Sequence, residues 1–168
     1  MINWMYFPRN IAADKTSLNI IDAFTSVLPQ IDSSTNNLAS NDVLAHLYMP
    51  LSNINFIVES GKSTGKKVHI PVLFGLNGKT QLSFDADAFN LQEKYVIEVE
   101  AGRAFANNQF LKDFFEACAM HNVDYLCIAV RNEYRNIPDF KKICAFFDAL
   151  YASGRLQVPL KGLLIIGY

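Results

Sequence analysis

The sequence predicts an α/β fold in which helices flank a mixed β-sheet. Residues 95–101 read Tyr-Val-Ile-Glu-Val-Glu-Ala, and such a nearly continuous apolar run is typical of a buried strand. Residues 104–120 and 138–152 carry apolar side chains at helical spacing, and each segment precedes a strand-like run, at 123–130 and 163–166. A helix between two strands is commonly a parallel crossover, so part of the sheet should be parallel.

Length and composition favour one globular domain. The chain has 168 residues, of which 51% are hydrophobic, and this is enough to bury a core. We expect a single domain over residues 1–168, with a helical N-terminal part to about residue 53 and an α/β core from about residue 54. The sequence contains no run of 18 apolar residues and no export signal, so we expect no membrane segment and a cytoplasmic location. The three cysteines and three histidines lack metal-ligand spacing and are expected to be structural.

The first half of the chain gives weaker signals. Residues 1–14 have no clear pattern, residues 16–28 have helical periodicity that ends at Pro29, and residues 30–41 form a polar loop. Ser40 or Asn41 should cap a short helix that runs to about Tyr48 and stops near Pro50. Strands are then expected at 54–59 and 68–74, separated by a loop at 60–67 and followed by a turn at 75–79.

Carboxylates gather in the next predicted pair of strands. Residues 81–89 and 95–101 flank a polar break at 90–94, which is the pattern of a hairpin. Asp85 and Asp87 lie on the first strand, and Glu98 and Glu100 share one face of the second, about 7 Å apart. Burying ionised carboxylates is costly, so a cation or a catalytic role is expected to offset the cost. The alternative is that these acids face solvent on an exposed sheet.

This arrangement resembles the core of the PD-(D/E)xK nucleases, the restriction-endonuclease-like superfamily. The resemblance covers about residues 65–131: an acid on one strand, Glu-x-Glu on the next, then a helix and a buried strand. It implies a restriction-endonuclease-like fold with Asp87 or Asp85 as the first acid and Glu98 as the second. Glu100 stands where the family usually has lysine, and some restriction enzymes of the superfamily share this Glu-x-Glu form. No proline precedes either aspartate, which departs from the family pattern.

The resemblance also implies a divalent cation, Mg²⁺ or Mn²⁺, held by Asp87 (or Asp85), Glu98 and the backbone carbonyl of Val99. Magnesium prefers hard oxygen ligands and keeps several waters, which suits two carboxylates and a carbonyl. The cation would activate water and neutralise charge on phosphorus, and Glu100 would accept a proton or bind a second ion.

Several polar residues are candidates for nucleic-acid contacts. The loop at 60–67 lacks the spacing of a phosphate-binding loop, yet it contains the densest basic group of the chain. Each candidate has an alternative interpretation as a solvated residue or surface ion pair, and the net charge of −1 argues against binding by bulk electrostatics. The candidates are Lys62, Lys66, Lys67, Arg103, Asn107, Asn108, Arg131 and Tyr134.

The sequence therefore favours a metal-dependent endonuclease that hydrolyses DNA and acts as a homodimer. A catalytically inactive protein of the same fold that binds nucleic acid or protein is the alternative, since lysine is missing from the motif. An unrelated metal-dependent hydrolase built on the same carboxylates is a third possibility.

Overall fold

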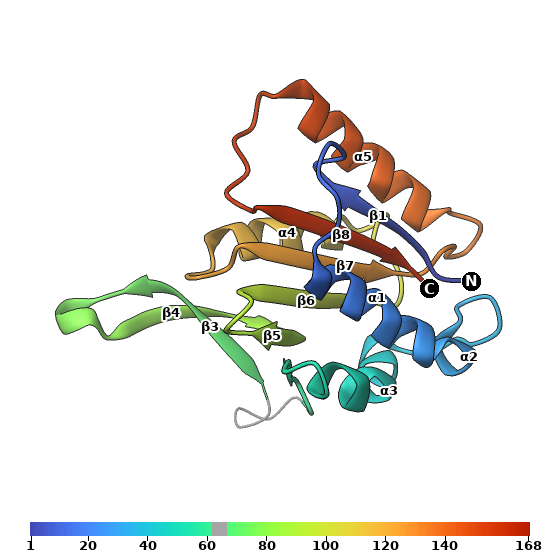
Figure 1. Cartoon of the computed structure of the whole chain (residues 1–168), viewed down its shortest axis with the longest axis horizontal. Helices are drawn as coiled ribbons and strands as arrows, with labels where there is room; N and C mark the ends of the chain where they lie inside the picture. The colour runs from blue at the N-terminus through green and yellow to red at the C-terminus, as the bar shows by residue number, and fades with distance from the viewer. Residues whose placement is uncertain (62–66) are drawn as a thin grey trace.

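A computed structural model describes residues 1–61 and 67–168, and it confirms the α/β fold with a mixed sheet flanked by helices (Figure 1). The main sheet has six strands in the order β1-β8-β7-β6-β5-β2. Its strands are β1 (Asn3–Phe7), β2 (Ile57–Val58), β5 (Ala88–Asn90), β6 (Tyr95–Glu100), β7 (Tyr125–Val130) and β8 (Gly162–Gly167).

The centre of the sheet is parallel, as the crossover helices predict. β6 pairs in parallel with β7, and β7 pairs in parallel with β8. The edges are antiparallel, because β1 pairs with β8, β5 with β6, and β2 with β5. The carboxyl ends of β6, β7 and β8 therefore lie at one edge of the sheet.

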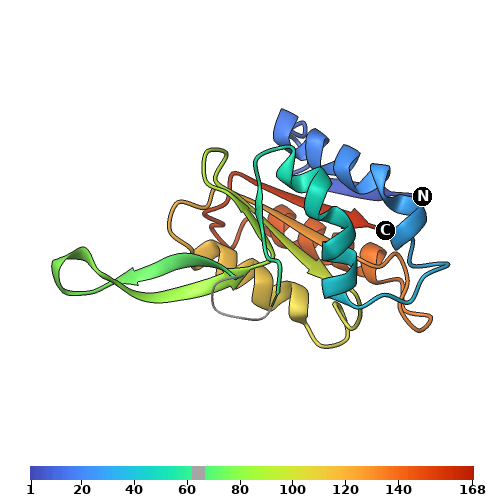
Figure 2. The same cartoon turned by 90° about the horizontal axis from the view of Figure 1, so that it is seen from below.

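Helices cover both faces of this sheet (Figure 2). One face packs against α1 (Lys15–Ser26), α2 (Leu28–Ile31) and α3 (Ser40–Ser52). The other face packs against α4 (Gln109–Ala119) and α5 (Asp139–Ser153). The helical N-terminal part thus forms one layer of the same domain.

Alternation along β6 divides its side chains between the two faces. Tyr95, Ile97 and Val99 are buried toward α1 and α3, whereas Val96 is buried toward α4 and α5. Because successive side chains point to opposite faces, Glu98 and Glu100 share the face of Val96. The sequence therefore places two carboxylates on the face that α4 covers.

A separate two-stranded hairpin projects from the body, and we call it the arm (Figure 1). It consists of β3 (Val68–Phe74), a turn with a short 3₁₀ helix (Leu76–Gly78), and β4 (Thr80–Ala86). The predicted hairpin of 81–89 with 95–101 is wrong in its first strand. Residues 80–86 pair with β3, and only Ala88–Asn90 pair with β6, because the chain leaves the arm at Asp87.

Other differences lie at element ends. Asn3–Phe7 forms strand β1, although its sequence shows no clear alternation. Helix α3 continues through Pro50 to Ser52, and the strand expected at 54–59 contains only Ile57–Val58. Helix α4 begins at Gln109, because Asn108 adopts a left-handed conformation with φ of 55°.

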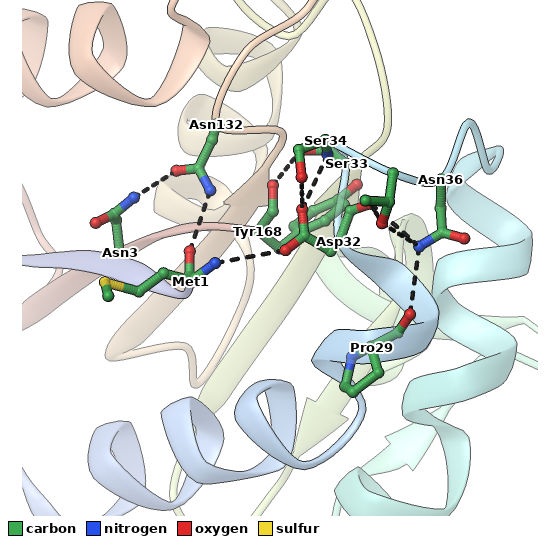
Figure 3. Close-up of polar contacts among 10 residues, drawn as sticks. Met1, Asn3, Pro29, Asp32, Ser33, Ser34, Asn36, Asn132 and Tyr168 are labelled. Atoms are coloured by element: carbon green, nitrogen blue, oxygen red, sulfur yellow. Dashed lines mark hydrogen bonds and ion pairs between the residues drawn. The ribbon is translucent and has the colours of Figure 1, made fainter.

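Polar contacts join the first and last residues of the chain to the loop after α2 (Figure 3). Asn132 accepts a 2.8 Å hydrogen bond from Asn3 and donates one of 3.3 Å to the Met1 carbonyl. The Ser33 hydroxyl donates to the Tyr168 carbonyl. The Tyr168 hydroxyl in turn donates a 3.2 Å hydrogen bond to the Glu100 carbonyl, so this network reaches the end of β6.

No helix in the described part of the chain is long and apolar enough to cross a membrane.

We predict that Phe147→Ala lowers the free energy of unfolding by about 3–5 kcal/mol. Phe147 is fully buried on α5, and its ring lies 5.1 Å from that of Phe114 and 5.8 Å from that of Phe110. Urea denaturation measures the loss. Phe146→Ala is the matched control and should cost much less, because the neighbouring Phe146 is 37% exposed. Equal losses at both positions would contradict the packing described for α5.

Candidate functional site

The predicted carboxylates meet in a cavity of about 410 Å³ at the carboxyl end of β6. Six carboxyl groups and two lysines line it, which makes it the most acidic cavity described. Its lining residues are Ser40, Glu59, Lys67, Asp85, Ala86, Asp87, Glu98, Val99, Glu100, Lys112 and Asp113.

Three parts of the fold bring these groups together. Strand β6 presents Glu98 and Glu100, and α4, packed over the same face, presents Asp113 and Lys112. Asp87 occupies the single residue between β4 and β5, where the chain turns from the arm into the main sheet. The cavity therefore lies where the arm, the sheet and α4 meet.

Asp87 is fixed by the backbone of β6. Its Oδ2 atom accepts a 2.7 Å hydrogen bond from the Val99 N–H. The β5–β6 ladder ends at the pair Ala88 and Ile97, so β5 leaves the following residues of β6 unpaired on that side. Since the N–H and C=O of one strand residue point to the same side, the Val99 carbonyl also faces Asp87. Two oxygen donors, from Asp87 and Val99, thus point toward the same space.

Burial and mutual repulsion make these carboxyl groups weak acids. Burial raises the pKa of Asp87 to about 6 against the opposing effect of the Val99 hydrogen bond, and Glu59 adds repulsion. The pKa of Glu98 is raised well above its ordinary value, first by burial and then by Asp87 and Asp113. Burial, with repulsion from Asp113 and Asp87, raises the pKa of Glu100 to about 8.

Asp113 is the least expected member of the cluster. It is only 4% exposed, and its Oδ2 atom is buried without a hydrogen-bond partner among the described residues. Burial raises its pKa to about 7, although Lys112 acts to lower it. An unpartnered carboxylate oxygen in an acidic cavity is costly, and a bound cation would remove that cost.

Two lysines lie beside the carboxylates. The Lys112 Nζ atom is 2.9 Å from Glu116 Oε2 and 3.7 Å from Asp113 Oδ1. Partial burial acts to lower the pKa of Lys112, but Glu116 and Asp113 raise it, so the side chain is charged. Lys67 lies at the base of the arm, 2.5 Å from Asp85 Oδ2.

Asp85 and Asp87 differ in their surroundings, which the sequence alone did not separate. Both oxygens of Asp85 have cationic or ring partners, Lys67 at 2.5 Å and His69 Nδ1 at 2.6 Å. The hydrogen bond from Lys67 holds the pKa of Asp85 below its usual value. Asp87 is partly buried near Glu98, and one of its oxygens is free of protein hydrogen bonds among the described residues. This geometry favours Asp87 as the first acid.

The candidate nucleic-acid residues are dispersed. Arg103, Asn107 and Asn108 are exposed, in the turns between β6 and α4 rather than in a first helical turn, and they do not line the described cavity. Lys67 lines it, whereas Lys62 and Lys66 lie outside the described residues.

Arg131 and Tyr134 have structural contacts that the sequence did not indicate. Arg131 is 8% exposed and donates hydrogen bonds of 3.0 Å to Asn37 Oδ1 and 2.7 Å to the Leu38 carbonyl. The guanidinium carbons of Arg131 and Arg135 lie 5.5 and 5.3 Å from the centroid of the Tyr134 ring. The side chain of Arg131 holds the loop before α3 against β7, and a role of Arg131 in nucleic-acid binding stays a prediction.

Sequence reasoning missed Asp113, Lys112, Glu59 and Ser40. A signal for Asp113 was available, because it lies between Phe110 and Phe114 on the buried stripe of α4. A charged residue on such a stripe requires a partner or a function. The positions of Glu59 and Ser40 depend on tertiary contacts, including the 3.0 Å hydrogen bond that the Ala101 N–H donates to Ser40 Oγ.

The site offers few protein ligands for a metal ion. Within residues 1–61 and 67–168, no three His, Cys, Asp or Glu side chains are placed to ligate one metal ion together. The predicted set has two carboxylates, Asp87 and Glu98, and one backbone carbonyl. Comparisons of the chain with protein-family models, curated proteins and solved structures find no significant match.

We predict that, in EDTA, the free energy of unfolding falls as pH rises from 5 to 8.5. The pKa values of Asp87, Asp113 and Glu100 are about 6, 7 and 8, above the values of about 4 in an unfolded chain. Between those limits the folded state binds more protons than the unfolded state, so its stability decreases with pH. Thermal and urea unfolding at both pH values measure the effect.

Asp113→Asn should remove part of this dependence. It should raise the melting temperature at pH 8.5, by about 2–4 °C for each kcal/mol recovered, and have less effect at pH 5. The exposed Glu133→Gln is the control and should change neither value. Stability that is constant or rises from pH 5 to pH 8.5 would show that the cluster ionises freely.

Proposed function

We propose that this protein is a metal-dependent endonuclease that hydrolyses phosphodiester bonds of DNA. The observation that supports it most strongly is the placement of Asp87, Glu98 and Glu100 in one acidic cavity. These are the residues that the resemblance to the restriction-endonuclease-like superfamily assigns to the site, although the sequence alone did not decide between Asp85 and Asp87. Desolvation and repulsion raise the pKa values of all three, which is typical of functional sites.

The donor set suits Mg²⁺ or Mn²⁺. Asp87, Glu98 and the Val99 carbonyl supply oxygen ligands, the kind that these cations prefer. Positive charge there would offset the burial and the repulsion from Asp87 and Asp113 that raise the pKa of Glu98. When bound, the cation supplies a water of lowered pKa and neutralises charge on the phosphate.

The residues around that set have separate tasks in this proposal. Glu100, with a pKa of about 8, holds or accepts a proton at its carboxylate near neutral pH. Lys112 supplies a positive charge from α4, on the same side as Glu100. The family motif usually has a lysine at the position of Glu100. In this proposal Lys112 takes the place of that lysine and contacts a phosphate oxygen. Asp113 and Glu116 position Lys112.

Glu98→Ala tests the site. In calorimetric titrations with Mn²⁺ and plasmid-nicking assays on the same samples, we expect the variant to lose binding and to nick at least about 100-fold more slowly. The exposed Glu133→Ala is the matched control and should behave as wild type.

The outcomes separate the alternatives. Binding and nicking that persist in Glu98→Ala would refute the site assignment. Binding without nicking in wild type would direct the assay to RNA and single-stranded DNA. Neither binding nor nicking in wild type would favour the inactive interaction protein.

Lys112→Met tests the role of α4. Nicking should slow by about 10–100-fold, while Mn²⁺ affinity should stay equal or increase, because a positive charge beside the carboxylates is lost. Lys112→Arg is the control and should retain most of the activity, since it keeps the charge. Equal rates for Lys112→Met and wild type would exclude a contact between Lys112 and the phosphate.

A further inference from the structure

The arm has two chemically different faces. Ile70 pairs with Phe84, and both pack against the core beneath α4 and α5, so this face of the arm is apolar at its base. On the opposite face His69 pairs with Asp85 and Pro71 with Ser83. Beyond the pair of Pro71 and Ser83 the register of the two strands shifts, and the exposed Gln81 follows Ser83 along β4 toward the turn.

The polar face of the arm is continuous with the acidic cavity. Lys67 and Asp85 belong to both, since they line the cavity and lie at the base of the arm. Asp87 follows β4 directly, so the candidate first acid lies where the arm leaves the main sheet. A substrate that reached Asp87 along this side would therefore pass over His69, Ser83 and Gln81.

The charge of the arm suits a polyanion. From residue 67 to residue 86 there are two lysines, Lys67 and Lys79, and one aspartate, which gives +1 with histidine neutral, whereas the whole chain has −1. Asp85 is neutralised by its ion pair with Lys67, which leaves Lys79 at the turn. Positive charge is thus found on the arm, and negative charge in the cavity.

The dimensions of the arm match a groove of duplex DNA. Beyond Phe84, which packs on the core, β4 extends over the four residues 80–83, a length of about 13 Å. At about 3.4 Å per base pair, this spans roughly four base pairs. A two-stranded β-ribbon fits the major groove, where amide side chains such as Asn and Gln bind adenine through two hydrogen bonds. Asn77 and Gln81 are of this type, and both are exposed.

We propose that the arm binds the groove of double-stranded DNA beside the cleavage position, and that Asn77, Lys79 and Gln81 make the contacts. This rests on the proposed function for its substrate and extends it by naming the element and the side chains that bind the duplex. Lys79 contacts a phosphate, and the amides of Asn77 and Gln81 contact base edges. Leu76, which is 85% exposed at the turn, provides apolar contact there.

The test measures binding separately from cleavage. Fluorescence anisotropy in EDTA compares a 30-base-pair duplex with a 30-nucleotide single strand of the same sequence, over a range of salt concentrations. We expect wild type to prefer the duplex. Lys79→Ala should weaken duplex binding and reduce the slope of log K against log salt by about 1. Lys141→Ala is the matched control and should leave the slope unchanged, because Lys141 is exposed and belongs to α5, which lies apart from the arm (Figure 1).

A shortened arm gives the second variant. Replacing residues 74–81 with Asn-Gly retains the buried base of the arm, and thermal unfolding should confirm that the body stays folded. We expect at least a 10-fold loss of duplex affinity, with single-strand binding little changed.

The outcomes distinguish this inference from the nuclease proposal. Duplex nicking and duplex binding that are both unchanged in the shortened variant would overturn the inference and leave the nuclease proposal standing. Duplex binding through the arm without nicking would support the inference and refute the nuclease proposal. Sedimentation that shows an arm-dependent dimer, with DNA binding unchanged, would overturn the inference in favour of contact with a second copy of the chain.

Discussion

The register of β6 within the sheet determines where the acidic cavity of this protein lies. Helices cover β6 on both faces, and alternation sends Glu98 and Glu100 toward α4 while Val99 enters the opposite core. A shift by one residue would exchange these faces and place two carboxylates among the apolar side chains of α1 and α3. The apolar core therefore enforces the position of the acidic cavity.

The clustered carboxyl groups of the cavity destabilise the folded state, and the rest of the fold has to offset this. Glu98, Asp113 and Asp87 are desolvated and repel one another, and among the described residues Lys112 acts to lower the pKa of each of them. The surrounding anchors are firm: Val99 binds Asp87, Tyr168 binds the Glu100 carbonyl, and Ser40 binds Ala101. These hydrogen bonds fix the positions of the carboxyl groups before any ligand binds, which is the property called preorganisation.

The sequence was sufficient for the parts of the fold that local patterns determine. The buried strands β6 and β7 and the crossover helices follow from periodicity and strand order, whereas the association of Asp87 with Glu98 was implied by the family resemblance. The sequence did not predict that residues 80–86 pair with β3. The alternation of residues 80–86 suits the arm and the main sheet equally, and the turn at Asp87 depends on tertiary packing. The contribution of Asp113 from α4 was readable as a charge on an apolar stripe, whereas the burial of Arg131 against Asn37 joins residues distant in sequence.

The arm contains an irregularity between Pro71 and Phe74, where the pairing of β3 with β4 shifts register. Residues on the body side of this point are anchored in the core, and those beyond it contact little of the domain. Insertions, deletions and substitutions in the outer part therefore leave the backbone at Asp87 undisturbed. Selection can alter the reach and chemistry of the hairpin tip while the acidic cavity stays constant, so the two can evolve as separate modules.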